Sequence, residues 1–230
     1  LIVTGTSEGE SESASRLCLD YPSYLFSTAG VHPHDANNVS QNYLEVLTEL
    51  AIKSHVVAIG ECGLDFNRNF SAPKQQIKVF QEQIALAASL NMPLFLHQRD
   101  AFEEWYQCLS PYLDRIPNAI SHCFTGSKKE LQQCLEADMY IGITGWLCDE
   151  RRGQALRDIV AQIPLNRLLI ETDAPYLTPR SIRPKPKSSR NEPSYLPHIV
   201  KAIAALTDYT EEQIIHQTAQ NTQQVFLLGP

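Results

Sequence analysis

Short apolar segments alternate with amphipathic segments along the whole chain, and this alternation limits the fold more than any other feature of the sequence. Each apolar run is followed by a segment whose apolar residues recur at helical spacing. In the segment 73–90, for example, Ile77, Phe80 and Ile84 share one helical face, and Pro73 suits a first turn. We expect strands at residues 1–4, 24–31, 56–61, 93–97, 119–124, 139–145 and 168–177. We expect helices near 7–20, 40–53, 73–90, 101–113, 127–137, 151–161, 194–206 and 211–226.

Strands that alternate with helices imply a parallel sheet. A TIM (β/α)8 barrel needs eight strands and about 250 residues. The 230 residues hold seven strand–helix units and begin at Leu1, inside an apparent strand. We therefore predict that residues 1–230 form a single barrel domain that is N-terminally incomplete, with the first βα unit absent. A doubly wound sheet is the alternative fold.

Histidine or carboxylate side chains stand at the ends of several predicted strands. The four that we single out are Glu61, His97, His122 and Asp173. In a barrel, the C-terminal ends of the strands form one rim, where barrel enzymes carry their chemistry. Imidazole and carboxylate groups are ligands for Zn²⁺, Mn²⁺ and Mg²⁺. We predict that these four side chains share a metal site.

The two carboxylates of this set are the predicted catalytic residues. A carboxylate at this place could bridge two ions, and Asp173 could also accept a proton from an attacking water molecule. A single buried histidine is often structural, and a glutamate after a strand often caps a helix or pairs with arginine. The same pattern at four strand ends favours the metal site.

Further residues close to these strand ends could also contribute to a site. His32 and His34, on either side of Pro33, could contact a substrate phosphate, support a metal ligand, or belong to an ordinary polar loop. Arg99 could bind substrate or pair with Asp65. The cysteines next to two of the ligands, at positions 62 and 123, are interpreted as packing residues.

The distribution of charge limits how the protein could bind nucleic acid. The net charge of −7 argues against broad non-specific binding of nucleic acid, although it allows a local basic site. The loop 179–191 is such a candidate, since it follows the last predicted strand and contains no acidic residue. Barrel enzymes often bind phosphate in this region, and a merely solvated loop is the alternative. Its cationic residues are Arg180, Arg183, Lys185, Lys187 and Arg190, the last of which is a predicted substrate-binding residue.

The remaining composition is that of an ordinary globular protein. Hydrophobic residues make up 43% and charged residues 20% of the chain. No apolar run approaches the roughly 20 residues that cross a bilayer, and we expect no membrane partner. The six cysteines contain no CxxC pair, which favours free thiols in a reducing cytoplasm.

An ordered series of motifs resembles the TatD family of metal-dependent deoxyribonucleases over essentially the whole chain. The motifs are GVHPHD, AIGECGLDFNRNFS, NMPLFLHQRDA, HCFTG, YIGITGW, CDERRG, LLIETDAPYL and RNEP. The resemblance implies a TIM-barrel metallo-dependent hydrolase of the amidohydrolase type. It implies 3′–5′ exonuclease action on single-stranded DNA and RNA, with Mg²⁺ favoured and Mn²⁺ or Zn²⁺ as alternatives, and a role in DNA repair.

By motif, the family's metal positions fall on Glu61, His97, His122 and Asp173. This chain contains no counterpart of the HxH pair that most relatives carry on the first strand. Two alternatives to a nuclease remain open. One is a metallohydrolase acting on ester, lactone or aminoacyl-tRNA bonds, which the absence of a lysine at any strand end disfavours. The other is a non-catalytic nucleic-acid-binding or scaffold protein. We expect a monomer.

Overall fold

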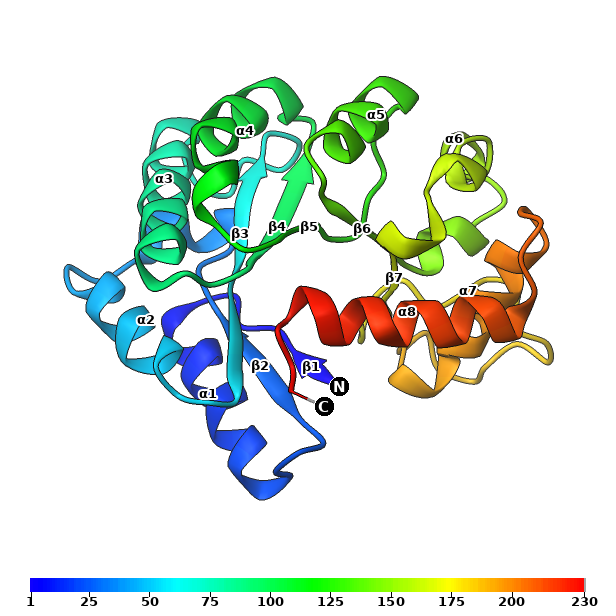
Figure 1. Cartoon of the computed structure of the whole chain (residues 1–230), viewed down its shortest axis with the longest axis horizontal. Helices are drawn as coiled ribbons and strands as arrows, with labels where there is room; N and C mark the ends of the chain where they lie inside the picture. Colours follow the sequence, from blue (N-terminus) through cyan, green and yellow to red (C-terminus); the bar gives the residue numbers. More distant parts are fainter. Residues whose placement is uncertain (230) are drawn as a thin grey trace. The chain divides into compact units, whose positions relative to one another are not determined.

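The structure, a computed structural model, describes residues 1–229 and consists of two compact units (Figure 1). The first unit comprises Leu1–Ile120 together with Val225–Gly229, and the second comprises Ser121–Gln224. Both units are built from parallel strands and helices that alternate along the chain. No helix in the described residues is long and apolar enough to cross a membrane.

In the first unit, each strand pairs in parallel with the next strand of the chain. A doubly wound sheet reverses its strand order at a switch point, and no such reversal occurs among these strands. The strands are β1 (Ile2–Val3), β2 (Phe26–Ala29), β3 (Val56–Asp65) and β4 (Leu94–Arg99). The helices are α1 (Glu8–Asp20), α2 (Tyr43–Ala51), α3 (Pro73–Leu90) and α4 (Phe102–Leu109). In Figure 1, α1, α2 and α3 lie along one side of β2 and β3, as their contacts require.

The strand β3 differs from the prediction, because it continues beyond Glu61 to Asp65. Its register against β4 shifts between Gly60 and Cys62. Gly63 has a φ of 149°, which residues with a side chain rarely adopt. A Cβ at this position would lie 1.9 Å from the carbonyl oxygen of His97. Glycine therefore lets the two backbones approach closely, and Glu61 lies inside a bulged strand rather than at its end.

In the second unit, β6 (Tyr140–Ile143) pairs in parallel with β7 (Leu168–Ile170). The helix α5 (Lys128–Glu136) begins with a capping box formed by Ser127 and Glu130. Its other helices are α6 (Gln154–Arg157) and α7 (Leu196–Ala204). The division between the units falls before the last residue of the strand β5 (Ala119–Ser121) and before the last residue of the helix α8 (Glu211–Val225).

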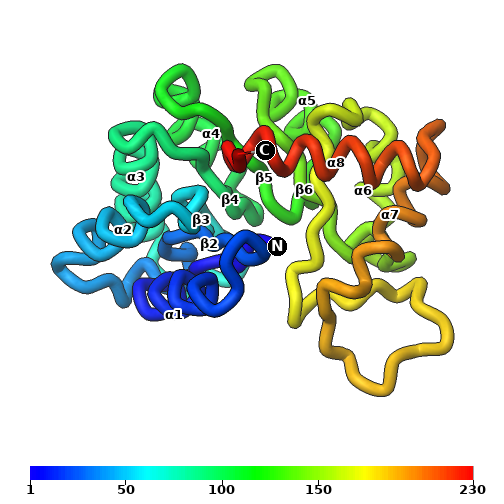
Figure 2. Tube along the Cα trace, turned by 60° about the horizontal axis from the view of Figure 1, so that its bottom comes forward, coloured from blue at the N-terminus to red at the C-terminus, as the bar shows by residue number. Residues whose placement is uncertain are grey.

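Two predicted helices are shorter than expected. The helix predicted at 101–113 ends at Leu109 and continues as a 3₁₀ helix, in which Pro111 cannot donate an α-helical hydrogen bond. The segment 151–161, which is predicted to be helical, forms a single α-helical turn, α6, which starts after Gly153. The long segment between β7 and α7 contains no strand and, apart from a short 3₁₀ turn before α7, no helix (Figure 2).

Candidate active site

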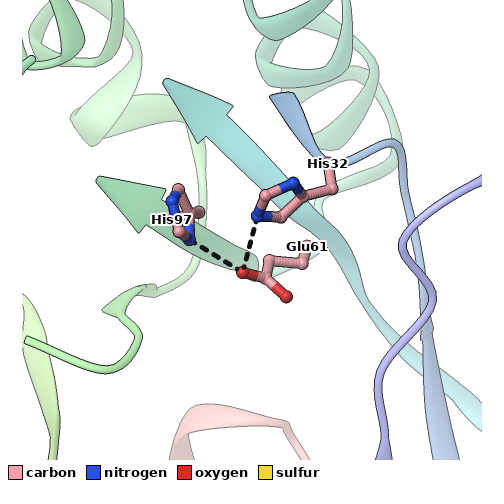
Figure 3. Close-up of side chains that lie close together, drawn as sticks. All are labelled: His32, Glu61 and His97. Atoms are coloured by element: carbon pink, nitrogen blue, oxygen red, sulfur yellow. Dashed lines mark hydrogen bonds and ion pairs between the residues drawn. The ribbon is translucent and has the colours of Figure 1, made fainter. Parts of the chain in front are cut away.

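Three side chains from three successive segments of the first unit meet around one carboxylate oxygen (Figure 3). His32 follows β2, Glu61 lies in β3 and His97 lies in β4. Glu61 Oε1 is 3.0 Å from His97 Nδ1 and 3.5 Å from His32 Nε2. All three potential ligand atoms lie within 4.8 Å of one another. Glu61 is 7% exposed, so this carboxyl group is nearly excluded from water.

A second carboxyl group, that of Asp65, lies beside this cluster. Its Oδ2 is 2.7 Å from His34 Nε2 and 3.6 Å from His97 Nε2. Burial raises the pKa of Asp65, but the nearby imidazole of His97 and the hydrogen bonds from the backbone N–H of Arg68 and from His34 outweigh burial and hold the pKa well below its usual range. Asp65 is therefore a carboxylate at neutral pH, and it lies next to both histidines.

His32 is neutral in this environment. Its burial lowers the pKa to about 3, and the opposing attraction of Glu61 is the smaller effect. A neutral imidazole has an unprotonated nitrogen, which is the form that binds metal ions. The charge state of His32 therefore suits a ligand role as well as the predicted contact with substrate.

Two buried glutamines of α3 fix the backbone on either side of this cluster. Gln83 accepts a hydrogen bond from the backbone N–H of Val31 and donates one to its carbonyl group, at 2.8 and 3.0 Å. Gln76 does the same for Asp65, at 2.9 and 3.1 Å. Both glutamines are wholly buried. The helix thus sets the positions of the residue before His32 and of Asp65 itself.

The second unit gathers a separate group of potential ligands. His122 Nε2 lies 3.7 Å from Asp173 Oδ1, and His122 Nδ1 lies 2.6 Å from Glu171 Oε2. Asp173 has a φ of 57°, in the left-handed region, and its side chain is 33% exposed. His122 is almost fully buried. This group therefore combines one enclosed imidazole with one carboxylate that water can reach.

The ligand types and distances fit a divalent ion. Two ligand atoms about 2.1 Å from one ion lie about 3 Å apart at a right angle and further apart at wider angles. The pairs Glu61–His97 and His122–Asp173, at 3.0 and 3.7 Å, agree with this geometry. The buried carboxyl group of Glu61 beside the neutral imidazole of His32 also favours a cation, because unbalanced buried charge is costly. That all four side chains bind a common ion stays a prediction, since the pairs belong to different units.

The remaining predicted residues lie at the edges of these groups. Arg99 is half-buried at the end of β4, opposite Asp65 in the strand register. Arg190 is exposed and lines an open cleft of about 490 Å³ together with Ala174 and Pro175, which follow Asp173 directly. Cys62 is wholly buried, as expected of a packing residue.

The backbone around this cleft is held by Asn191. Its side-chain amide donates to the carbonyl oxygens of Thr172 and Tyr176, at 2.6 and 2.7 Å. Its backbone N–H bonds to Pro175. Asn191 is buried, so Arg190 is fixed next to the segment that carries Asp173.

Glu171 is the residue that sequence reasoning left out of the site. It contacts His122 and accepts a hydrogen bond from the backbone N–H of Cys123 at 3.0 Å. Its position two residues before Asp173 is the sequence feature that points to it, since alternate residues of an extended segment point to the same side.

The parallel strands and the histidine–carboxylate groups at their ends define an α/β metallo-dependent hydrolase of TIM-barrel type. Its resemblance to solved structures is extensive. A TatD homologue from Escherichia coli K12 is 25% identical, with a TM-score of 0.88 over 99% of this chain and 86% of that one. A hydrolase TatD family protein from Entamoeba histolytica is 27% identical, with a TM-score of 0.87 over 97% of this chain and 83% of that one.

The chain belongs to the TatD related DNase family, whose model matches residues 1–227. A protein from Pectobacterium carotovorum named 3'-5' ssDNA/RNA exonuclease TatD is 51% identical over 100% of this chain and 88% of its own length. A protein of the same name from Citrobacter rodentium is 52% identical over 98% of this chain and 86% of its own length. The predicted family is thereby confirmed.

Proposed function

We propose that this chain is a divalent-metal-dependent 3′–5′ exonuclease that acts on single-stranded DNA and RNA. The observation that carries the proposal is the cluster of His32, Glu61 and His97 in a chain of this family. The names of relatives more than 50% identical to it support the polarity of digestion and the single-stranded substrate.

We propose that the four predicted ligands bind divalent metal: Glu61 and His97 in the first unit, and His122 and Asp173 in the second. Mg²⁺ is the ion that we favour, and Mn²⁺ or Zn²⁺ are the alternatives. When bound, such an ion supplies positive charge that offsets the charge developing on a phosphate during displacement. The assignment draws support from the ligand distances within each unit.

Asp173 is the residue to which we assign the proton transfer. Its carboxyl group is partly exposed, so a water molecule can reach it. In the reaction, the water oxygen attacks phosphorus, its proton passes to Asp173, and the bond between phosphorus and the leaving nucleotide oxygen breaks. Glu61, which is buried, contributes negative charge and orientation rather than proton transfer.

Substrate phosphates are proposed to meet the cationic residues near these groups. Arg190 lines the cleft beside Asp173, and Arg99 lies at the end of β4. His34 is engaged by Asp65, so its proposed contact with substrate would use its partly exposed ring edge. The role in DNA repair, the cytoplasmic location and the monomeric state stay predictions.

Digestion of a single strand labelled at either its 5′ or its 3′ end tests the proposal. With Mg²⁺ we expect stepwise shortening from the 3′ end, and none after EDTA treatment. Asp173→Asn should lower the rate by at least about 100-fold, because it removes the proton acceptor. Asp114→Asn, at an exposed position of the first unit, is the matched control and should digest normally.

Two results would contradict the proposal. Digestion that persists in EDTA and in Asp173→Asn would remove the metal mechanism. Hydrolysis of esters or lactones by a protein that leaves every oligonucleotide intact would favour the other class of metallohydrolase.

A further inference from the structure

The carboxyl group of Glu171 is enclosed between His122 and the strand β6, and the proposed reaction gives it no role. Its Oε2 lies 2.6 Å from His122 Nδ1 and accepts a hydrogen bond from the backbone N–H of Cys123. Cys123 has a φ of 46°, in the left-handed region. The contact with the imidazole is thus tied to the backbone directly after His122.

Gly142 of β6 makes the space for this carboxyl group. A Cβ on Gly142 would lie 2.1 Å from Glu171 Oε1 and 2.4 Å from Cδ, closer than atoms can approach. The neighbouring backbone is also bonded to β6: Phe124 donates to the carbonyl oxygen of Gly142, and Glu171 donates to that of Ile143, both at 2.9 Å. The missing side chain at position 142 therefore sets where the carboxyl group lies.

This arrangement is not one that stability alone would favour. Glu171 Oε1 is buried and has no hydrogen-bond partner among residues 1–229, and the close contact of Oε2 with His122 Nδ1 does not have the geometry of an ordinary hydrogen bond. An unsatisfied buried oxygen costs free energy, so a purely structural side chain at this place would be better replaced by an apolar one. The carboxyl group is explained instead by its contact with the imidazole.

We propose that Glu171 is a positioning residue that keeps the ring proton of His122 on Nδ1 and thereby presents the unprotonated Nε2, next to Asp173, to the divalent ion. A carboxylate 2.6 Å from Nδ1 favours the ring proton on that nitrogen, and a carboxylate beside the other ring nitrogen of a metal-bound histidine commonly fixes its tautomer and ring orientation. The 3.7 Å between Nε2 and Asp173 Oδ1 fits two ligands of one ion. The proposal rests on the proposed metal-dependent function but concerns only residues of the second unit.

The ring tautomer of His122 can be measured in the metal-free full chain by NMR with ¹⁵N-labelled histidine. The signals of His122 are identified by their loss in His122→Gln. We expect the proton on Nδ1 in the unsubstituted protein and in Glu171→Gln, which keeps an acceptor oxygen. We expect this preference to be lost in Glu171→Leu and in Gly142→Ala, which retains the carboxyl group but displaces it.

The affinity for Mn²⁺, measured by calorimetry, gives a second readout. Glu171→Leu and Gly142→Ala should each bind Mn²⁺ about 10- to 100-fold more weakly. Glu136→Gln, on the exposed end of α5, and Gly9→Ala, where an added Cβ meets nothing within 4 Å, are the matched controls and should bind normally. Circular dichroism shows whether each variant is folded. If Glu171→Leu does not fold, Gly142→Ala still tests the proposal.

An unchanged tautomer and unchanged Mn²⁺ affinity in a folded Glu171→Leu or Gly142→Ala would overturn the proposal. Failure of the proposed function looks different. In that case, the unsubstituted protein would digest no oligonucleotide with any divalent ion, whereas the tautomer measurement, made without metal, would still report on Glu171.

Discussion

Glu61 and Asp65 bring two carboxyl groups into a nearly dry part of the first unit, and the imidazoles around them determine the local charge. Asp65 is stabilised as a carboxylate by hydrogen bonds, whereas burial keeps His32 neutral. The cluster therefore combines negative charge with unprotonated nitrogen, the combination that divalent cations select.

The neutral state of His32 predicts how stability depends on pH. The folded-state pKa of about 3 lies below the unfolded value of about 6.5, so below pH 6.5 the unfolded chain binds a proton that the folded chain excludes. The stability from this residue is complete above pH 6.5 and is lost as the pH falls towards 3. Relative to the His32→Gln variant, the free energy of unfolding of the metal-free protein should fall by about 1.4 kcal/mol for each unit by which the pH is lowered within this window.

Urea unfolding of both proteins at pH 7, 6 and 5 measures this difference. A ring signal of His32 that titrates between pH 6 and 7 in the metal-free protein would contradict the prediction. So would a difference in unfolding free energy between the two proteins that does not change with pH.

At the scale of elements, the contact between β3 and β4 depends on glycine. The strands carry Glu61 and His97, and Gly63 lies opposite His97 in the register. The close approach at Gly63 is what allows both ligands to reach the same place. A side chain here would separate the strands or break their pairing.

Gly63→Ala tests this dependence. The added Cβ would clash with the carbonyl oxygen of His97, and the φ of 149° is unfavourable for alanine. We therefore expect the free energy of unfolding to fall by about 3 kcal/mol or more. Gly9→Ala in the first turn of α1 is the control, and it should leave stability unchanged or raise it by up to about 1 kcal/mol. Equal unfolding free energies for Gly63→Ala and the unsubstituted protein would refute this account of the strand contact.

At the scale of the whole molecule, a net charge of −7 coexists with a cationic loop at 179–191. All five cations of the loop are exposed, and within the described residues none forms an ion pair. They are Arg180, Arg183, Lys185, Lys187 and Arg190. An acidic protein can therefore still present a local site for phosphate groups.

Replacing Arg183, Lys185 and Lys187 together by serine should weaken the binding of single-stranded DNA and reduce its salt dependence. The slope of log K against log salt should become shallower by about 2, because each lost phosphate contact contributes about 0.7. Fluorescence anisotropy on an Asp173→Asn background measures binding without digestion. The control triple Lys53, Lys74 and Lys201 to serine, at exposed positions, changes the net charge equally. An equal effect of both triples would show that only overall charge matters.

The alternation of strands and helices, and much of the candidate site, could be predicted from single segments. The helix α3 has the predicted bounds, since Pro73 and the apolar spacing are local signals. Glu61 and His97 can be predicted as site residues because they follow apolar runs, and the structure brings them together. The extension of β3 could not be predicted, because it depends on how closely β4 approaches Gly63.

The family, the order of the elements and the residue types near the strand ends can be predicted without a structure, because they follow from local periodicity and motif spacing. The groups that lie next to each ligand depend on the folded chain: Asp65 beside His34 and His97, the glutamines of α3 on the backbone, and Glu171 against His122 in the space left by Gly142. These contacts join residues far apart in the chain. Their distances, burial and pKa values are set by packing, which no local pattern records.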